Sequence, residues 1–522
     1  MQGYSNLFQP HSPLRAAYFR IRAAWRTRTK GRPLPPSPNP LPIIGNMLDM
    51  PTKKPWVGFR ELCARYGDVV HLQVFGQHMI VLDSAEAITE FLEKRTNNTS
   101  DRLIGVDWLV GLLPYGDMWR KYRRAFWQYF HPNAVSAYRP VQLAVTRKFL
   151  VKLLRDPSDF KQLTRFSFSA TILKVGYGID IDDPDHPLIR VIDDALEGTA
   201  QTFIPGRYLV DTFPALEYLP SWIPGAGFQK LFAKWKEATS MLLRMPYEQR
   251  NEAFTEDVVP YDQASILDSL SARIQAEDGD AKLSQEQEAL VQKVLGVAFE
   301  AAIFPTEHVE KTIGSVYAAF LAMSLFPEVQ NRAQAELDAV VGPHRLPTFE
   351  DRDKLVYVNA LIKESLRWHN ITPLSIAHRT NVDDEFCGYF VPAGTVLVAN
   401  VWSCMHDPIV YPDPDEFRPE RFIRDGKLDP DVRDPMNYAF GFGRRICPGR
   451  HFADAGLFLN VVSVLHVFNI GPPVDSAGNP IKVVPSQSDG FLSYPEDCRC
   501  TFTPRSAQAS ALILGGGTAD GH

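Results

Sequence analysis

Apolar residues recur at spacings of three and four along most of the chain between about residues 85 and 370. This period matches one face of an α-helix, so the sequence predicts a long helical body. Two earlier runs, residues 69–75 and 78–82, have the composition of strands and the close spacing of a β-hairpin. After residue 370, short strand-like runs alternate with proline-rich turns, and a final helix is expected just after Pro448, through Val467. The pattern predicts a mainly α protein with a small β portion, in a single domain.

The two ends of the chain differ from this body, which we place at residues 33–503. Residues 1–32 include seven basic residues and no acid. This composition fits a basic linker, whose membrane anchor would be missing from this version of the chain, or a mitochondrial presequence, and we favour the linker. The proline-rich start of the body, residues 33–42, should run extended. Residues 504–522 are expected to be a disordered tail.

Composition narrows the functional classes. The chain has 522 residues, of which 45% are apolar and 22% charged, with a formal net charge of −6. These values are ordinary for a globular protein and do not indicate nucleic acid as a partner. The six cysteines form no CxxC pair and no Cys/His cluster, so neither a zinc site nor a disulfide framework is indicated. No apolar stretch reaches the roughly 18 residues that cross a bilayer.

The strongest chemical signal is a glycine-rich segment around one cysteine, residues 440–449, with the sequence FGFGRRICPG. Its glycines allow the backbone to fold tightly around Cys447, and Pro448 is typical of the first turn of a helix. Backbone N–H groups, the helix N-terminus and two arginines would favour the thiolate over the thiol. Such a thiolate can serve as a nucleophile, a redox sensor or a metal ligand. No Ser/His or Cys/His partner motif stands beside it, so nucleophilic catalysis has little support.

The pattern FxxGxRxCxG, which runs from Phe440 to Gly449, resembles the haem-binding loop of cytochromes P450. The resemblance extends over residues 33–503. It implies the cytochrome P450 fold as one haem-binding domain, and haem b whose iron is ligated by the Cys447 thiolate. In that family the thiolate pushes electron density through the iron and favours O–O cleavage.

A second match is Glu364-Ser-Leu-Arg367, which resembles the ExxR element of the same family. A glutamate and an arginine three positions apart lie on one face of a helix and can pair. The third member of the group would be Arg421, in the segment FRPERF. The resemblance implies that the three residues brace the loop leading to Cys447 and take no part in catalysis.

Haem carries two propionates, so cationic side chains should converge on it. Trp119 and Arg123 resemble the family's WxxxR element, and Arg445 lies two residues before the cysteine. His378 resembles the residue after the ExxR helix that reaches a propionate, with Arg379 as its competitor. We expect Trp119, Arg123, His378, Arg445 and Cys447 to bind the cofactor.

The resemblance fails at the oxygen-activating helix, which usually reads [AG]Gx[DE]T[TS]. Counted forward from the upstream helix, the motif falls on residues 301–306 and loses both its acid and its hydroxyl. Counted back from Ala319, it keeps Glu310 and Thr312 but places Lys311 at the hydroxyl position. Six residues turn a helix by about 240° beyond a full turn, so only one register can face the haem.

We favour the second register, because the helix that follows matches without gaps. Glu310 and Thr312 are then the candidate catalytic residues. The surplus lies near residues 301–306 and includes Pro305, which would kink the helix. It is either a genuine bulge or a remnant of imperfect intron removal in the gene model.

The resemblance implies hydroxylation of a small organic molecule by O₂, with electrons passed from NADPH-cytochrome P450 reductase. Arg444, Arg450 and His451 are expected at the reductase face. The sequence looks most like basidiomycete members, many of which act on secondary metabolites. Two rivals remain: a haem-thiolate isomerase or dehydratase that needs no O₂ activation, and a haem protein without function.

The expected location is the cytosolic face of the endoplasmic reticulum membrane, with the mitochondrion as the alternative. Residues 203–235 mix prolines with apolar and aromatic residues. They resemble the family's segment over the substrate entrance that dips into the membrane. An apolar loop packed on the core explains the same composition.

Overall fold

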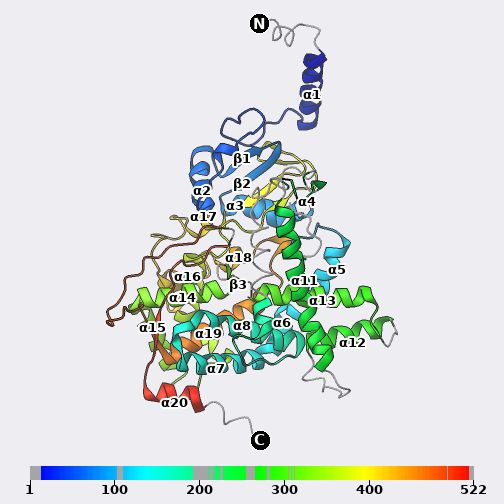
Figure 1. Cartoon of the computed structure of the whole chain (residues 1–522). Helices are drawn as coiled ribbons and strands as arrows, with labels where there is room; N and C mark the ends of the chain where they lie inside the picture. Colours follow the sequence, from blue (N-terminus) through cyan, green and yellow to red (C-terminus); the bar gives the residue numbers. More distant parts are fainter. Residues whose placement is uncertain are drawn as a thin grey trace.

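The computed structural model describes residues 13–102, 110–191, 210, 216, 218–220, 222–223, 227–253, 265–278, 282–303, 305–306, 309–310, 312–490 and 492–515. Its helices are α1 (Pro13–Thr29), α2 (Pro55–Tyr66), α3 (Ala85–Ile88), α4 (Thr96–Thr99), α5 (Asp117–Phe130), α6 (Pro132–Val135), α7 (Arg139–Arg155), α8 (Phe160–Tyr177), α11 (Phe228–Ala253), α12 (Ile266–Asp278), α13 (Gln285–Ile303), α14 (Thr312–Leu325), α15 (Pro327–Val340), α16 (Val356–Trp368), α17 (Val401–Met405), α18 (Met436–Ala439), α19 (Arg450–Val467) and α20 (Ala507–Gly515) (Figure 1). Its strands are β1 (Val69–Val74), β2 (Gln77–Leu82), β3 (Pro305–Thr306), β4 (Val309–Glu310), β5 (His378–Arg379), β6 (Asp384–Phe386), β7 (Tyr389–Val391), β8 (Val396–Ala399), β9 (Ile423–Arg424), β10 (Lys427–Leu428), β11 (Phe468–Gly471) and β12 (Thr501–Pro504).

The helical body is built around two helices that are buried on nearly all sides. α19 is buried almost throughout, and α14 is buried from Ile313 to Met323. Asp, Glu, Lys and Arg are absent from α14 over this stretch and from α19 after Asp454, so these parts can pack on every face. α8, α13 and α16 cover them, and the mainly α fold expected from the sequence is confirmed.

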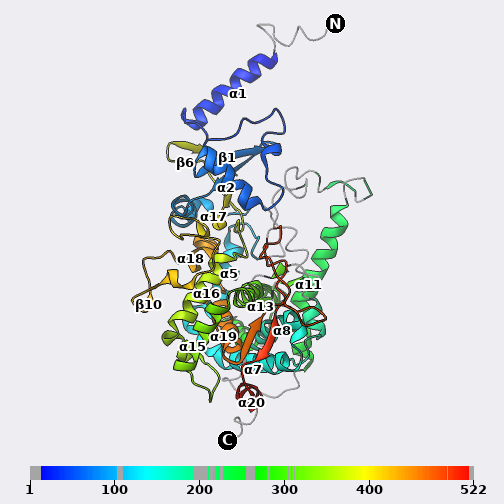
Figure 2. The same ribbon diagram turned by 90° about the vertical axis from the view of Figure 1, so that its left-hand side faces the viewer.

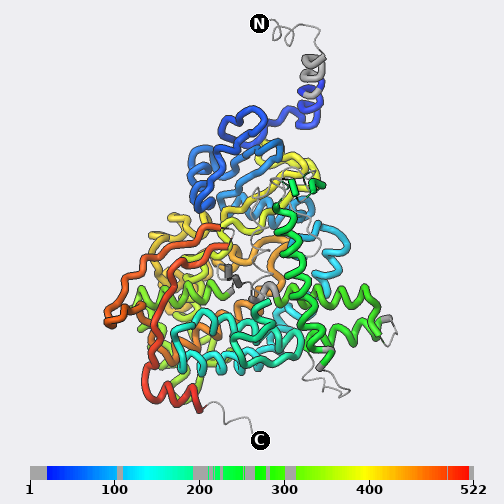
Figure 3. Tube along the Cα trace, in the orientation of Figure 1, coloured from blue at the N-terminus to red at the C-terminus, as the bar shows by residue number. Residues whose placement is uncertain are grey.

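The main sheet has the strand order β1-β2-β8-β5. The predicted hairpin is present as β1–β2, with Val69 opposite Leu82. Its turn lies at Phe75 and Gly76, whose φ angles are 48° and 88°, because a two-residue hairpin turn of this hand needs positive φ at both positions. β8 joins β2 in parallel, so residues near 80 and near 397 lie side by side (Figure 3).

The basic N-terminal segment forms α1, which projects from the sheet end of the molecule (Figure 2). Its last turns are fixed to the body. Trp25 stacks on His78 at 6.1 Å between ring centroids, and Arg28 makes a two-pronged ion pair with Asp383 at 2.8 and 2.6 Å. The proline-rich stretch that follows is extended, as predicted. The carbonyl of Pro33 accepts a hydrogen bond from the backbone N–H of Phe390 in β7.

The expected disorder of residues 504–522 is wrong for most of this segment. β12 pairs with β11, and α20 packs on α7 and α19. Ala509 and Ile513, four residues apart, form the buried face of α20. The helix has only nine residues, which is too short for its apolar period to be recognised in the sequence. Residues 516–522 lie outside the described part of the chain.

The helix over the predicted oxygen-activating motif is interrupted. α13 ends at Ile303, β3 and β4 form a two-residue ladder with Pro305 opposite Glu310, and α14 begins at Thr312. We expected a kink and a surplus at residues 301–306, whereas residues 301–303 remain helical and the helix is broken after them. Proline disfavours helical backbone in the residue before it, which accounts for the end of the helix at this point.

Most of residues 203–227 lie outside the described part of the chain, so the choice between entrance segment and packed loop stays open there. Two described side chains in this stretch, Tyr218 and Trp222, are 84% and 79% exposed. None of the described helices is both long enough and apolar enough to cross a membrane.

Candidate active site

The glycine-rich segment forms a tight loop that leads into α19. Gly441 and Gly443 have φ angles of 76° and 56°, which side-chain-bearing residues rarely adopt. A Cβ on Gly443 would lie 2.3 Å from the Leu92 carbonyl oxygen, so only glycine fits this approach. The Cys447 N–H donates to the Phe440 carbonyl at 2.7 Å and closes the loop. The sequence therefore folds locally to present one cysteine.

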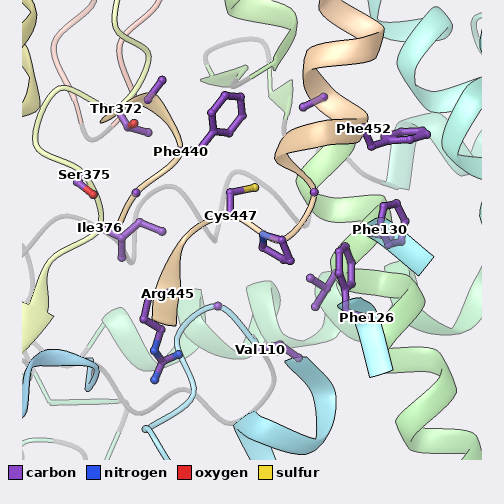
Figure 4. Close-up of a pocket in the computed structure, with 18 of the residues that line it drawn as sticks. Val110, Phe126, Phe130, Thr372, Ser375, Ile376, Phe440, Arg445, Cys447 and Phe452 are labelled. Atoms are coloured by element: carbon purple, nitrogen blue, oxygen red, sulfur yellow. The ribbon is translucent and has the colours of Figure 1, made fainter. Parts of the chain in front are cut away.

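Cys447 lies in a cavity between the cysteine loop, helices α5, α13 and α19, and the segment 369–378. Figure 4 shows Phe126, Phe130 and Phe452 on one side of it and Thr372, Ser375 and Ile376 on the other. The aliphatic part of the wall comes from Val110, Val294, Val297, Ala298, Leu366, Ile371, Ile376 and Leu457. The five residues predicted to bind the cofactor, Trp119, Arg123, His378, Arg445 and Cys447, all line this cavity.

Arg445 is buried in the wall of the cavity and has spare hydrogen-bonding capacity. Its Nε donates to the Ser100 carbonyl and its Nη2 to the Leu113 carbonyl, both at 2.7 Å. Its Nη1 is buried and has no partner within the described part of the chain. The guanidinium lies over the Trp119 ring, 4.4 Å from the centroid, and Arg123 lies 6.0 Å from the same ring. Trp119 thus positions two cations.

Arg102 is a third cation in the cavity, and the sequence analysis did not identify it. Its Nη1 donates to the carbonyls of Ile376 and Ala377 at 2.7 and 2.8 Å, while its buried Nε has no partner among the described residues. The residue begins a long apolar run, and nothing in its neighbours marks it as a ligand. The signal that could have identified Arg102 is its place beside an apolar run of the sequence, because an arginine is rarely buried unless it is paired.

Burial acts on all three cations. It lowers the pKa of Arg123 and of Arg445 to about 10 each. It lowers the pKa of Arg102 well below its usual value, and the nearby charge of Arg445 adds to this effect. None of the three forms an ion pair with a carboxylate within the described residues. Such cations are costly in a protein interior unless an anionic group binds to them.

The sequence model of the family "Cytochrome P450" matches residues 35–495. The chain belongs to the cytochrome P450 family. It is 40% identical to cytochrome P450 monooxygenase COX2 of Coprinopsis cinerea, over 93% of this chain and 92% of that protein. It is 38% identical to tryptamine 4-monooxygenase of Psilocybe cyanescens, over 94% of this chain and 96% of that protein. Cytochrome P450 monooxygenase claR of Ampulloclitocybe clavipes is 36% identical, over 92% and 88% of the two chains.

The predicted resemblance to basidiomycete members is confirmed, and the chain is a cytochrome P450 monooxygenase, an oxidoreductase. The family carries a haem whose iron has a cysteine thiolate ligand. The cavity of this P450 fits that group: it contains one cysteine, and the unpaired Nε of Arg102 and Nη1 of Arg445 are donors suited to the two propionates.

His378 lies beside the same cations and is itself buried. Its Nδ1 donates to the Thr99 carbonyl at 2.6 Å. Burial and the charge of Arg102 hold its pKa well below 6.5, so the imidazole is neutral and Nε2 carries no proton. His378 would therefore donate to a propionate only after a proton is added. Its competitor Arg379 does not line the cavity.

The predicted brace beneath the cysteine loop is present. Glu364 is fully buried and accepts hydrogen bonds from Arg367 Nε and Nη2 at 2.7 and 2.9 Å, and from Arg421 Nε at 3.1 Å. It also accepts from the backbone N–H of Arg418 at 2.8 Å. Arg367 in turn donates to the carbonyls of Met405, Pro414 and Glu416. One carboxylate thus ties α16 to the segment that precedes the cysteine loop.

The candidate catalytic residues are placed only by their backbone. Glu310 lies in β4, at the end of the interruption, and Thr312 is the first residue of α14. The side chains of residues 300–312 lie outside the described part of the structure. The roles of Glu310 and Thr312 therefore stay predictions.

Proposed function

We propose that this P450 hydroxylates a small organic molecule with O₂ and electrons derived from NADPH, at haem b bound through the Cys447 thiolate. The observation that carries the proposal is that Cys447 lines the same cavity as Arg102, Arg123 and Arg445. The two carboxylates of the cofactor would offset two of these three positive charges. When bound, the haem would supply O₂ activation at an iron whose sulfur ligand favours O–O cleavage.

The chain's own residues would hold the cofactor and shield it from water. Arg102 and Arg445 would each donate through the nitrogen that lacks a partner among the described atoms, and Arg123 would add charge. The ring of Trp119 would keep Arg123 and Arg445 in place. The aliphatic walls from α13 and segment 369–376 would exclude water and bind an apolar carbon skeleton. The relative from Psilocybe cyanescens is a tryptamine 4-monooxygenase, which supports a small organic metabolite as the substrate class.

Proton delivery is the weak point of the proposed reaction. A hydroxyl or acid must lie within hydrogen-bond reach of the reacting oxygen. We assign this task to the Glu310 carboxyl and the Thr312 hydroxyl. Lys311 stands where the family motif has its hydroxyl, and the helix is broken just before it. The enzyme should therefore couple NADPH oxidation poorly to product and release much of the reducing power as hydrogen peroxide.

The broken helix also favours a second candidate function. A haem-thiolate isomerase or dehydratase needs no proton delivery to O₂, so the interruption over residues 304–311 would not impair it. A haem protein without turnover is a third outcome. All three candidates share the cavity and the cysteine, so haem uptake and turnover have to be measured together to separate them.

The proposed electron donor is NADPH-cytochrome P450 reductase, docked over the cysteine loop. Arg120, Arg124 and Arg450 surround a shallow surface pocket that also contains Ile446, next to the proposed ligand. Arg450 belongs to the face expected from the sequence. Arg444 is exposed but hydrogen-bonded to Tyr115 and Asn97. The Nε2 of His451 is buried and has no partner among the described residues, so we assign this face chiefly to the arginines.

We propose that the protein is associated with the cytosolic face of the endoplasmic reticulum membrane. The contacts of Trp25 and Arg28 with the body support the linker interpretation of residues 1–32 over a removable presequence, because cleavage would break them. Arg20, Arg22 and Arg26 on the projecting part of α1 are exposed, which suits an anionic lipid surface. The exposed arginines of α1 support the proposed location, and the membrane anchor stays an expectation.

One experiment tests the proposed function against its rivals. The purified protein is loaded with haem, and a reduced-CO difference spectrum is combined with NADPH consumption in the presence of the reductase. We expect the thiolate CO band together with NADPH oxidation that depends on the reductase. A thiolate band without reductase-supported turnover would favour the isomerase or dehydratase, and failure to take up haem would identify a non-functional protein.

A further inference from the structure

Asn370 is a buried amide at the edge of the active-site cavity. It lies two residues after the end of α16 and is 2% exposed. Its Oδ1 accepts the backbone N–H of Thr372 at 2.8 Å. Its Nδ2 is buried and has no hydrogen-bond partner in the part of the chain that the structure describes. A buried amide nitrogen without a partner is costly, so a ligand that supplies an acceptor would be favoured.

The orientation of this amide is fixed. If the amide were flipped, its NH₂ group would face the N–H of Thr372, and two donors would oppose each other. The Oδ1 must therefore stay on the backbone N–H. The other polar atom of the amide, Nδ2, is therefore a hydrogen-bond donor.

Asn370 lies at the end of segment 369–378 that is remote from the cations. Its neighbour Ile371 packs against α14, since a Cβ on Gly314 would lie 2.9 Å from Ile371 Cδ1. The other end carries Ile376 and Ala377, whose carbonyls accept from Arg102. Figure 4 shows the same order, with Thr372, Ser375 and Ile376 following one another toward Arg445. The Nδ2 donor is thus separated from the group proposed to bind the propionates.

We propose that Asn370 Nδ2 donates a hydrogen bond to the substrate and thereby selects a mainly apolar molecule that bears one acceptor oxygen, such as a carbonyl. The inference rests on the proposed function and adds the substrate class. The cavity that Asn370 lines has a largely apolar wall, which includes Val294, Val297, Ala298 and Ile371. A polar group in such a wall fixes the orientation of a ligand, because the rest of the contact is non-directional.

The test compares two probes of the same shape, 1-tetralone and tetralin, which differ by one carbonyl. Their dissociation constants for the haem-loaded protein are measured by equilibrium dialysis in the wild type and in variants. Asn370→Leu removes both polar atoms. Asn370→Asp keeps the acceptor for Thr372 and the shape of the side chain but lacks the donor, so it serves if the leucine variant folds poorly. Asn133→Leu, which changes an exposed amide on α6 that does not line the cavity, is the matched control.

We expect the ratio of tetralin to tetralone dissociation constants to fall roughly three- to tenfold in both Asn370 variants, the contribution of one neutral hydrogen bond. It should not change in Asn133→Leu. An unchanged ratio in the Asn370 variants would overturn the inference, as would loss of haem from them with the ratio preserved, which would assign Asn370 to the cofactor. A wild-type protein without the thiolate CO band would instead contradict the proposed function.

Discussion

Glu364 is the most highly constrained charged residue of the site. Its carboxylate and the Arg367 side chain are both fully buried, and Arg421 is 6% exposed. Removing one member of such a group leaves the others charged without compensation in the interior. We expect this group to support the cysteine loop, and the hydrogen bonds from Arg367 to the carbonyls of Pro414 and Glu416 agree with that task.

Glu364→Ala should lower the free energy of unfolding by about 3–5 kcal/mol and reduce the haem retained on purification, because two guanidinium groups lose their counter-charge. The matched control is Asp117→Ala, which removes an ion pair of the same i,i+3 spacing with Arg120 in which Asp117 is 99% exposed. This control should change stability by less than about 0.5 kcal/mol. Chemical denaturation and the haem-to-protein ratio measure both. Full haem occupancy and unchanged stability in Glu364→Ala would contradict the structural role.

Arg102→Leu should speed haem dissociation by roughly 10- to 100-fold, since a charge-assisted hydrogen bond contributes about 1.5–3 kcal/mol. Transfer of haem to apomyoglobin measures the rate. Arg102→Lys keeps the charge and should lose haem at an intermediate rate, which separates the charge from the bonds to the Ile376 and Ala377 carbonyls. Equal rates in the wild type and the leucine variant would remove Arg102 from the proposed haem site.

At this scale the sequence predicted those site residues that belong to local motifs. Trp119, Arg123, Arg445 and Cys447 each occupy a fixed place in a short pattern, and the fold brings them into one cavity. Arg102 and Asn370 could not be found in this way. Arg102 meets Ile376 across 274 positions of the chain, and the state of the Asn370 amide depends on which atoms surround it. Contacts of this kind arise when distant parts of the chain pack together, and they produce no periodic pattern in the sequence.

At the scale of elements, the break between α13 and α14 distinguishes this chain from the family pattern. β3 and β4 pair with each other, so the hydrogen bonds of this segment close locally instead of continuing the helix. Pro305 is one half of the first pair, and its missing N–H makes a return to helix unfavourable there.

Deleting Ala301–Thr306 removes β3 and Pro305 and should restore a continuous helix, with higher haem retention. Lys311→Thr in that background should then raise the product formed per NADPH, because a hydroxyl is returned to the place where proton delivery needs one. Haem content and the ratio of product to NADPH consumed measure the two steps. Tight coupling in the unmodified protein, or collapse of haem binding on deletion, would show that the interruption is a working part of the site.

Elements were predictable where their signal is local. The β1–β2 hairpin follows from two strand-like runs and a tight turn. The parallel pairing of β2 with β8 was not predicted, because contacts between distant parts of the chain have no local pattern. α20 was missed because it is short: it has nine residues, and its two buried residues, Ala509 and Ile513, are too few for a helical period to stand out.

At the scale of the whole molecule, charge is distributed unevenly although the chain is acidic overall. The formal net charge is −6, yet Arg120, Arg124 and Arg450 surround the surface pocket beside the cysteine loop. A basic surface on an acidic protein steers an acidic partner to that surface. The same surface lies next to the proposed iron ligand, because Ile446 lines it and precedes Cys447.

The rate of reduction by the reductase should fall as ionic strength rises, since salt screens exposed charges over about 8 Å at physiological concentration. Arg450→Glu should slow reduction further at low salt. Lys53→Glu, which changes an exposed residue just before α2, is the control and should have little effect. Stopped-flow measurement of the ferrous-CO complex gives the rate. A rate that depends on neither salt nor Arg450 would place the reductase on another face.

The account depends most directly on Cys447 as the iron ligand, and the reduced-CO difference spectrum of Cys447→Ser tests this claim. Serine keeps the shape of the loop but removes the sulfur. We predict that the thiolate CO band disappears in Cys447→Ser while the helical circular dichroism remains, and that Cys404→Ala, at a buried cysteine of α17, keeps the band. A normal thiolate band in the Cys447→Ser protein would contradict the account.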